Sequence, residues 1–415
     1  MVLRCASFRR LKIKQICIVF SFVVSIYLLY QIASTYFFPE NTSIKGKLSE
    51  KETHSKKTRN LTVEVWGKAA IGLYLWQHIL EGGLEERLGG VWQYGFQHVN
   101  GVNLHFRTGP GVVPDKVPRD VEHLVLVLNG REPAKVKMAE EWLQSLIQFA
   151  KLRNVAVVLL GNERWRACVS NTKAHLNMLM MHGRIGWCEN EWMEQYLTSR
   201  GGPVQHVYIV YDCPCVDNHN FYQWPLGVAT YRSFPVVATK DVQLEQPRRY
   251  VCNFQGTVYA NSSRETLLHV LQSNHLNSLC FVHPRYVWLP QETDKSRTEY
   301  INILRNSDLT LNPVGMNAEC YRIYEAMALS SIPVIEDQVT EGHCDRVPLR
   351  LLKKHKAPVE FINDWNDLPK LIVKYQRMPL PEIVTRRKNV LSWYIAFKET
   401  LRLQFIDTIK TRFNV

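Results

Sequence analysis

The chain has 415 residues, 46% of them apolar, which is enough to bury the cores of two ordinary domains. Its formal net charge is +13, but the first 15 residues carry +5 and residues 39–60 carry +3, which leaves +5 for residues 61–415. A globular part this mildly basic argues against a nucleic-acid-binding protein and suits small anionic ligands.

An apolar stretch near the N-terminus, residues 16–38, is long enough to span a bilayer. Five basic residues precede it within residues 1–15 and none lies inside it, so the tail should stay cytoplasmic and the rest of the chain should cross. A cleaved signal peptide is disfavoured, because the apolar core is too long and no small-x-small site follows it cleanly. We predict a type II signal anchor followed by a flexible stem, residues 39–60, which is polar and charged.

Glycosylation sequons agree with a luminal orientation for the rest of the chain. They begin at Asn41, Asn60 and Asn261, and each alone is a weak signal because such triplets also arise by chance. Their position after the predicted anchor makes them candidate N-glycan sites.

Eight of the ten cysteines follow the predicted anchor, since only Cys5 and Cys17 lie in it or before it. In a secretory compartment some of the eight should form disulfides, but the sequence alone does not predict which cysteines pair. Cys213-Pro214-Cys215 has a one-residue spacing that is unusual for a zinc site. No cysteine-based metal site is therefore expected.

The first domain is predicted to begin with a strand at 63–66 and a glycine-containing turn at 67–72 that opens an apolar helix through Leu80. The turn lacks the Lys-Ser/Thr pair of a P-loop, so tight packing of a helix on a strand is favoured over phosphate binding. Residues 81–120, rich in glycine and aromatic side chains, cannot be assigned.

A strand and helix series then predicts a parallel sheet covered by helices. The expected elements are a strand at 121–128, a helix at 133–152, and strands at 155–160 and 204–211. Ligands of such sheets collect beyond the carboxyl ends of the strands, where Glu132, Glu163 and Asp212 fall. The segment 164–187 breaks the pattern and is interpreted as a loop insertion.

A second α/β series is predicted after a turn at 224–228 and a linker at 243–249. It begins with a strand at 250–254, a helix at 261–271 and a strand at 280–282. Thr257, at the turn, and Arg264, in the following helix, form a candidate anion site; a plain surface arginine is the alternative.

Residues 307–337 are predicted to form a complete β-loop-α-β unit, in which Gly315 permits a sharp turn. Strands are expected at 309–311 and 332–335, and a helix at 317–329. Free backbone N–H groups at a helix start suit phosphate, which places Gly315 and Asn317 in a candidate donor site.

Arg322 and Glu325 lie three residues apart in this predicted helix and can share one face. A guanidinium can hold a diphosphate and a carboxylate can accept from sugar hydroxyls. A solvated ion pair is the other interpretation of this spacing. Beyond the unit, a strand at 357–362, a helix at 365–375 and a long amphipathic segment at 381–413 are expected, the last packing across both domains.

Several segments resemble the ribitol-5-phosphate xylosyltransferases, the family that extends the O-mannosyl glycan of α-dystroglycan. They are VEVWGKAAIGLYLWQHI, LVLNGRE, FYQWPLGVATYRSFPVV, YVCNFQGTVYANSSR and AECYRIYEA. More distantly, residues 307–337 are similar to the donor-binding half of exostosin-type glycosyltransferases. One departure is the segment 164–187, because the family runs almost directly from 161–163 to 190–192.

The resemblance implies a GT-B fold of the α/β class, with two Rossmann-like domains facing a cleft. Residues 61–245 would form the acceptor domain, 246–380 the nucleotide-sugar domain and 381–415 a C-terminal helical segment. It further implies a Golgi type II membrane enzyme that transfers xylose from UDP-xylose to ribitol 5-phosphate in β1,4 linkage. Association with fukutin and fukutin-related protein is implied as well.

The chemistry of inversion assigns roles to the candidate residues. UDP-xylose is an α-linked donor, so a β product requires one displacement, with a base for the acceptor proton and positive charge for the leaving UDP. No Asp-x-Asp occurs, so Arg322, Arg264 and the helix start would supply that charge without a metal. Asp212 is ranked over Glu163 and Glu132 as the base. A membrane-anchored glycan-binding or scaffolding protein without turnover is the alternative.

Overall fold

The computed structural model describes residues 61–413 apart from 68, 88, 90, 111–116, 163–189, 214 and 338–348. The expected tail, anchor and stem lie outside this part, together with Asn41, Asn60, Glu163 and the proposed insertion. Within the described residues, no helix is both long and apolar enough to cross a membrane.

The first sheet confirms the parallel series predicted for residues 61–211. Its described strands run in the order β2-β3-β4-β1-β5-β6-β7-β8, and every pair from β4 to β8 is parallel. Their bounds are β1 (Leu61–Gly67), β2 (Glu85–Arg87), β3 (Trp92–Val99), β4 (Val102–Thr108), β5 (His123–Asn129), β6 (Asn154–Leu160), β7 (Val204–Val210) and β8 (Phe221–Trp224). The unassigned segment 81–120 supplies β2, β3 and β4, of which β3 pairs antiparallel with both of its neighbours, and β8 was not predicted.

Alternating side chains of this sheet bury both of its faces, as the two-residue period of strands requires. On one face, residues such as Leu126, Val157 and Ile209 pack with α3 (Pro133–Ser145). The other face packs under a helical turn formed by α2 (Ile71–Leu73) and the π-helix η1 (Tyr74–Ile79). The tight packing predicted for residues 67–72 is confirmed, because a Cβ on Gly72 would lie 3.0 Å from the Cα of Gly67.

The helix predicted over 133–152 is shorter than expected. It ends at Ser145 and gives way to a 3-10 turn, η3 (Leu146–Gln148). The backbone N–H groups of Arg153 and Asn154 then donate to the carbonyl of Glu122, and β6 begins at this point. Further 3-10 turns follow at η4 (Glu191–Tyr196), η5 (Thr198–Arg200), η6 (Thr230–Arg232) and η7 (Thr239–Asp241).

The second sheet is wholly parallel in the order β10-β9-β11-β12-β13. Its strands are β9 (Tyr250–Thr257), β10 (Cys280–Arg285), β11 (Ser307–Asn312), β12 (Ile332–Glu336) and β13 (Glu360–Ile362). Its helical elements are α5 (Ser263–Ser273), η8 (Leu276–Ser278), α6 (Asp294–Arg305), α7 (Tyr321–Ala328), α8 (Arg350–Lys354), η9 (Trp365–Asp367) and α9 (Leu368–Arg377). The predicted boundary at 245/246 falls between β8 and β9, and α6 was not predicted.

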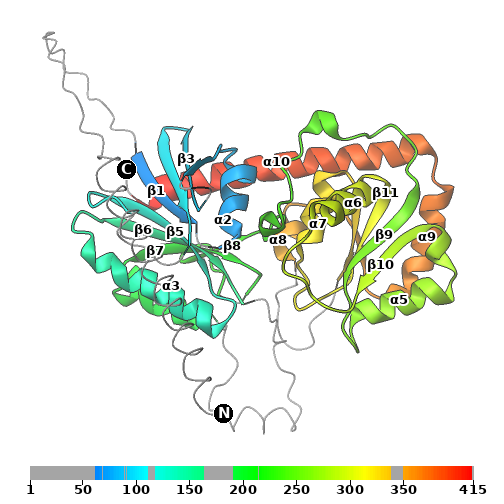
Figure 1. The fold of residues 1–415 in the computed structure, drawn as a ribbon, viewed down its shortest axis with the longest axis horizontal. Helices are drawn as coiled ribbons and strands as arrows, with labels where there is room; N and C mark the ends of the chain where they lie inside the picture. The colour runs from blue at the N-terminus through cyan, green and yellow to red at the C-terminus, as the bar shows by residue number, and fades with distance from the viewer. Residues whose placement is uncertain are drawn as a thin grey trace, which may run out of the picture. The chain divides into compact units, whose positions relative to one another are not determined.

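The long helix α10 (Leu380–Arg412) contacts elements of both sheets, as expected for the C-terminal segment (Figure 1). On the first sheet, the Tyr208 hydroxyl donates to the carbonyl of Phe405 at 3.2 Å. On the second, the fully buried Arg387 donates through Nε and Nη2 to Oδ1 of Asp308, at 2.8 and 2.6 Å. One apolar cluster therefore continues from the first sheet through α10 into the second.

The described cysteines partly settle the open question of disulfide pairing. Cys252 and Cys280 form a disulfide between paired positions of β9 and β10. Cys213 and Cys215 form another, directly after β7. Cys320 is free.

Candidate functional site

A pocket opens at the carboxyl ends of β9 and β10, beside the start of α7. Residues 229–234, which follow the first sheet, close its other side. Its described lining contains five arginines and two glutamates, a surplus of three positive charges: Arg232, Arg264, Arg285, Arg297, Arg322, Glu292 and Glu325. Such a surplus on a concave surface favours an anionic ligand.

Arg322 lies in the first turn of α7 and is 7% exposed. Its Nε donates to the carbonyl of Leu311 at 3.1 Å, and its Nη1 donates to the carbonyl of Gln255 at 2.6 Å. These contacts fix the guanidinium across the ends of two neighbouring strands. Its Nη2 is buried without a partner among the described residues. Because a buried unpaired donor is unfavourable, this geometry predicts a ligand acceptor at Nη2.

Two glycines make room for the arginines of the pocket. A Cβ at Gly256 would lie 2.7 Å from Nη1 of Arg322, and one at Gly315 would lie 2.2 Å from Nη2 of Arg264. Arg264 itself donates to the carbonyl of Thr257 at 2.6 Å. The predicted grouping of Thr257 with Arg264 is therefore present, since both line the pocket.

Glu325 lines the same pocket and is 4% exposed. One carboxylate oxygen accepts from the backbone N–H of Ala229 at 3.0 Å, and the other accepts from the hydroxyl of Tyr300 at 2.5 Å. Burial raises the pKa of Glu325, while these hydrogen bonds oppose that shift. Each oxygen keeps a second lone pair for a ligand hydroxyl.

The solvated ion pair considered for Arg322 and Glu325 is wrong. Both side chains are buried, and among the described residues no ion pair joins them. Their partners come instead from other segments of the chain.

The expected helix start at Asn317 is also wrong, because α7 begins at Tyr321 after the extended residue Cys320. The side-chain oxygen of Asn317 accepts from the backbone N–H of Glu319 at 2.9 Å, which holds residues 317–319 in a turn. Neither Gly315 nor Asn317 lines the pocket. Gly315 contributes by leaving space for Arg264 rather than by offering its own N–H.

Sequence reasoning missed a second group in the pocket, centred on Glu292. Arg285, the last residue of β10, donates to both carboxylate oxygens of Glu292, with its Nη2 at 3.0 Å from Oε2. Arg232 donates to the same carboxylate through Nη1 at 3.1 Å. The predicted strand at 280–282 stopped three residues before Arg285, so the position of Arg285 at the carboxyl end of β10 was not recognised.

Glu319 is a further residue that the sequence did not single out. It is 9% exposed, and its Oε1 accepts from the backbone N–H of Leu226 at 2.8 Å and from the hydroxyl of Tyr324. Burial raises its pKa to about 7, and the nearby charge of Asp212 adds to the shift. Glu319 and Glu325 together hold residues 226–229 against the second sheet.

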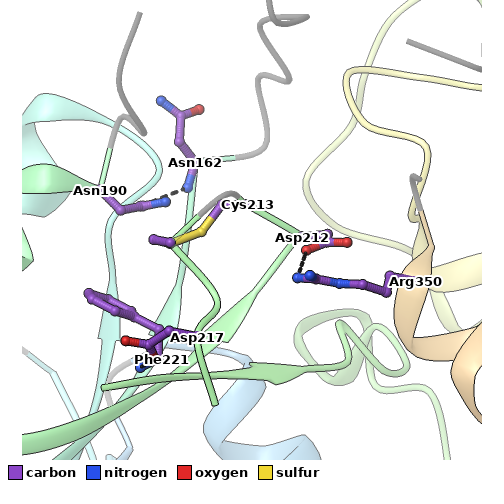
Figure 2. Close-up of a disulfide and its surroundings, with 8 residues drawn as sticks. Asn162, Asn190, Asp212, Cys213, Asp217, Phe221 and Arg350 are labelled. Atoms are coloured by element: carbon purple, nitrogen blue, oxygen red, sulfur yellow. Dashed lines mark hydrogen bonds and ion pairs between the residues drawn. A yellow bond between two sulfur atoms is a disulfide. The ribbon is translucent and has the colours of Figure 1, made fainter. Parts of the chain in front are cut away.

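The candidate bases on the first sheet have different surroundings. Asp212 is 8% exposed, and its Oδ1 accepts from Nη2 of Arg350 at 2.5 Å (Figure 2). It follows Tyr211, which has a positive φ of 68°, and precedes the Cys213–Cys215 disulfide. Strained backbone of this kind is common at functional sites. Glu132, by contrast, is exposed at the position preceding α3.

The remaining predicted sites are described only in part. Asn261 is exposed and has a left-handed backbone with a φ of 56°. Among the residues of known placement, no group of three or more His, Cys, Asp or Glu is arranged to hold a metal ion.

A mostly parallel first sheet and a wholly parallel second sheet, with an arginine-rich pocket at a carboxyl edge of the second, define an α/β protein whose pocket suits an anionic ligand. Comparison with known proteins narrows this class. The RXYLT1 N-terminal domain model matches residues 63–172 and 166–225, and the RXYLT1 C-terminal domain model matches residues 231–414.

Curated relatives agree with these matches. The chain is 43% identical to Ribitol-5-phosphate xylosyltransferase 1 of Homo sapiens over 379 residues, which cover 89% of this chain and 80% of the relative. It is 42% identical to the protein of the same name from Danio rerio over 374 residues, covering 88% and 81%. The chain belongs to the ribitol-5-phosphate xylosyltransferase 1 family.

Proposed function

We propose that the chain is an inverting glycosyltransferase of the GT-B type that transfers xylose from UDP-xylose to ribitol 5-phosphate. The observation that carries this proposal is Arg322, whose buried Nη2 lacks a partner among the described residues at the edge of a parallel sheet. The names of the relatives supply the sugar and the acceptor.

In the proposed donor complex, Arg322 and Arg264 bind the diphosphate of UDP-xylose and Glu325 accepts from the ribose hydroxyls. As the bond between the anomeric carbon and the diphosphate oxygen breaks, negative charge grows on UDP. A guanidinium already fixed by Leu311 and Gln255 stabilises that charge without reorganising.

Asp212 is the proposed general base. It takes the proton of the ribitol hydroxyl while that oxygen attacks the anomeric carbon from the side opposite UDP, which gives a β-xyloside and UDP. Asp212 does not line the described pocket, but its charge adds to the raised pKa of Glu319, the residue before the pocket residue Cys320. The role of Arg350 is to hold the carboxylate in place across the two sheets.

The cellular setting is part of the same proposal. The chain would be a single-pass type II protein of the Golgi membrane, acting in the lumen on the O-mannosyl glycan of α-dystroglycan beside fukutin and fukutin-related protein. The predicted signal anchor and the exposed sequon at Asn261 support luminal placement.

The deciding experiment measures UDP release and xylosyl transfer by the purified full-length protein with UDP-xylose and ribitol 5-phosphate. We expect a β-linked product, identified by NMR of its anomeric proton. Binding of both substrates without any product would favour the glycan-binding or scaffolding protein instead. Because arginines supply the positive charge, transfer should persist in EDTA; complete loss that manganese restores would overturn the metal-free mechanism.

A further inference from the structure

The outer part of the pocket carries a second set of basic side chains, separate from Arg322 and Arg264. Arg232, Arg285 and Arg297 all line it, and about a quarter of each side chain is exposed (24%, 25% and 28%). Glu292 neutralises part of this charge, but one carboxylate serves both Arg232 and Arg285. A net positive charge therefore remains at the entrance.

Arg297 is the member of this set whose present partner is weakest. Its Nη2 donates to Oδ1 of Asp294 at 2.7 Å, but the Asp294 side chain is 92% exposed. Ion pairs with exposed partners contribute little to stability, so Arg297 can exchange this contact for a ligand anion. Arg232 offers a further donor, because its Nε is buried without a partner in the described structure.

An aromatic side chain stands beside these arginines. Trp288 lines the pocket, remains 52% exposed, and lies 6.0 Å from the guanidinium of Arg232. Arg232 also donates to the carbonyl of Leu289 at 2.6 Å, which fixes the loop that carries the indole. A large exposed ring next to a cationic rim can cover the carbon chain of a polar ligand while the arginines bind its charged end.

The proposed reaction requires two anions in one site. The donor brings a diphosphate, which occupies Arg322 and Arg264, and the acceptor brings its own phosphate. Two like charges at close range repel unless separate positive groups compensate each of them. The positive charge of Arg232, Arg285 and Arg297 can compensate the phosphate of the acceptor.

We propose that Arg297, Arg232 and Trp288 form an acceptor subsite that recognises the phosphate of a sugar-alcohol phosphate. This inference rests on the proposed function and deepens it, because it assigns the acceptor's charged end to residues of the second sheet and of the segment after the first. Arg285 and Glu292 act as positioning residues for Arg232.

The test compares two acceptors, ribitol 5-phosphate and ribitol, with the full-length protein and its Arg297→Ala variant. We expect the variant to lower the preference for the phosphorylated acceptor, as the ratio of the two kcat/KM values, by about tenfold or more. The lower preference should come from a higher KM for ribitol 5-phosphate, while the KM for UDP-xylose should stay within about twofold of the wild-type value. Arg305→Ala, an exposed arginine of the same helix outside the pocket, is the matched control and should change nothing.

Two further variants and one binding measurement distinguish a failure of the subsite from a failure of the proposed function. Arg232→Ala and Trp288→Ala should weaken calorimetric binding of ribitol 5-phosphate in the presence of UDP, with thermal unfolding as a check on folding. An unchanged acceptor preference and unchanged binding in Arg297→Ala would overturn the inference, as would an equal rise in KM for the donor. Wild-type binding without turnover would instead refute the proposed function, while the binding of the variants would still test the subsite.

Discussion

Both sheets have a carboxyl edge formed by neighbouring parallel strands, but the two edges organise their side chains differently. At the second sheet, Arg264, Arg322 and Glu325 reach one pocket from two helices, α5 and α7. At the first sheet, Asp212 is buried and bound to Arg350, whereas Glu132 is exposed to solvent. Parallel strands therefore place polar residues at one edge of a sheet. Whether those side chains reach one pocket also depends on the direction of the helices and on glycines that leave space for long side chains.

The largest expected effect separates the two candidates on the first sheet. If Asp212 is the base, Asp212→Asn should lower kcat by roughly 10²–10⁴-fold, the range typical of general base catalysis. Glu132→Gln should leave kcat within about twofold, because the side chain points into solvent. Steady-state kinetics and thermal unfolding of both variants provide the measurement. A large loss in Glu132→Gln with normal activity in Asp212→Asn would reverse the assignment.

On the second sheet, Arg322→Ala should lower kcat/KM for UDP-xylose by about 10²-fold, with part of the loss in kcat, because the lost contact strengthens as UDP leaves. Arg322→Lys should recover little, since an ammonium group cannot span the carbonyls of Leu311 and Gln255 in the same way. Kinetics and UDP affinity are the readouts. If Arg322→Ala has wild-type kinetics, the donor site does not lie at the carboxyl edge of the second sheet.

A smaller effect is expected for Glu325→Gln, which keeps an acceptor for the N–H of Ala229. We expect UDP to bind about tenfold more weakly and kcat to change only a few-fold, because the ribose contact is the same in ground and transition states. Titration calorimetry with UDP gives the answer. Unchanged UDP affinity together with a lower unfolding temperature would mean that Glu325 only holds the chain at residue 229.

The most specific effect concerns stability rather than catalysis, namely the pH dependence of stability. The pKa of Glu319 rises from 4.5 to about 7 on folding, so the folded state binds this proton more tightly than the unfolded state. Its contribution to stability is therefore complete below about pH 4.5 and is lost as the pH rises through about 7. Compared with Glu319→Gln, the wild type should gain up to about 3 kcal/mol between pH 7.5 and pH 4.5. The measurement is the free energy of unfolding of both proteins across this pH range. A difference between wild type and Glu319→Gln that stays the same at all pH values would contradict the prediction.

The sequence predicted elements well where apolar runs dominate and poorly where the pattern is polar. The strands β5, β6 and β12 are near-continuous apolar runs, as parallel strands buried on both faces should be. The helix α6 was missed because its sequence, DKSRTEYINILR, buries only Ile301 and Leu304. The hairpin of β3 and β4 was missed although β4, VNLHFRT, alternates apolar and polar residues, as a strand buried on one face does.

The same contrast holds for the candidate site. Arg322 and Glu325 could be paired in advance because they lie within one short helical motif. Arg232, Arg285 and Glu292 come from a linker, a strand end and a loop, and no linear spacing brings them together. The helix start at 317 was predicted too early because the local turn of Asn317 competes with helical hydrogen bonds.

The helix α10 has a consequence for biosynthesis. Tyr208 and Trp224 of the first sheet pack against Phe405, which is translated about 180 residues after Trp224. At roughly 5–20 residues per second, ribosomes need on the order of 10–40 s to make that helix. During this interval the part of the sheet around Tyr208 and Trp224 lacks the cover of α10, so we expect the nascent first half to depend on chaperones for longer than its length suggests. Truncations that remove only the last turns of α10 should therefore impair folding of the sheet at the opposite end of the sequence.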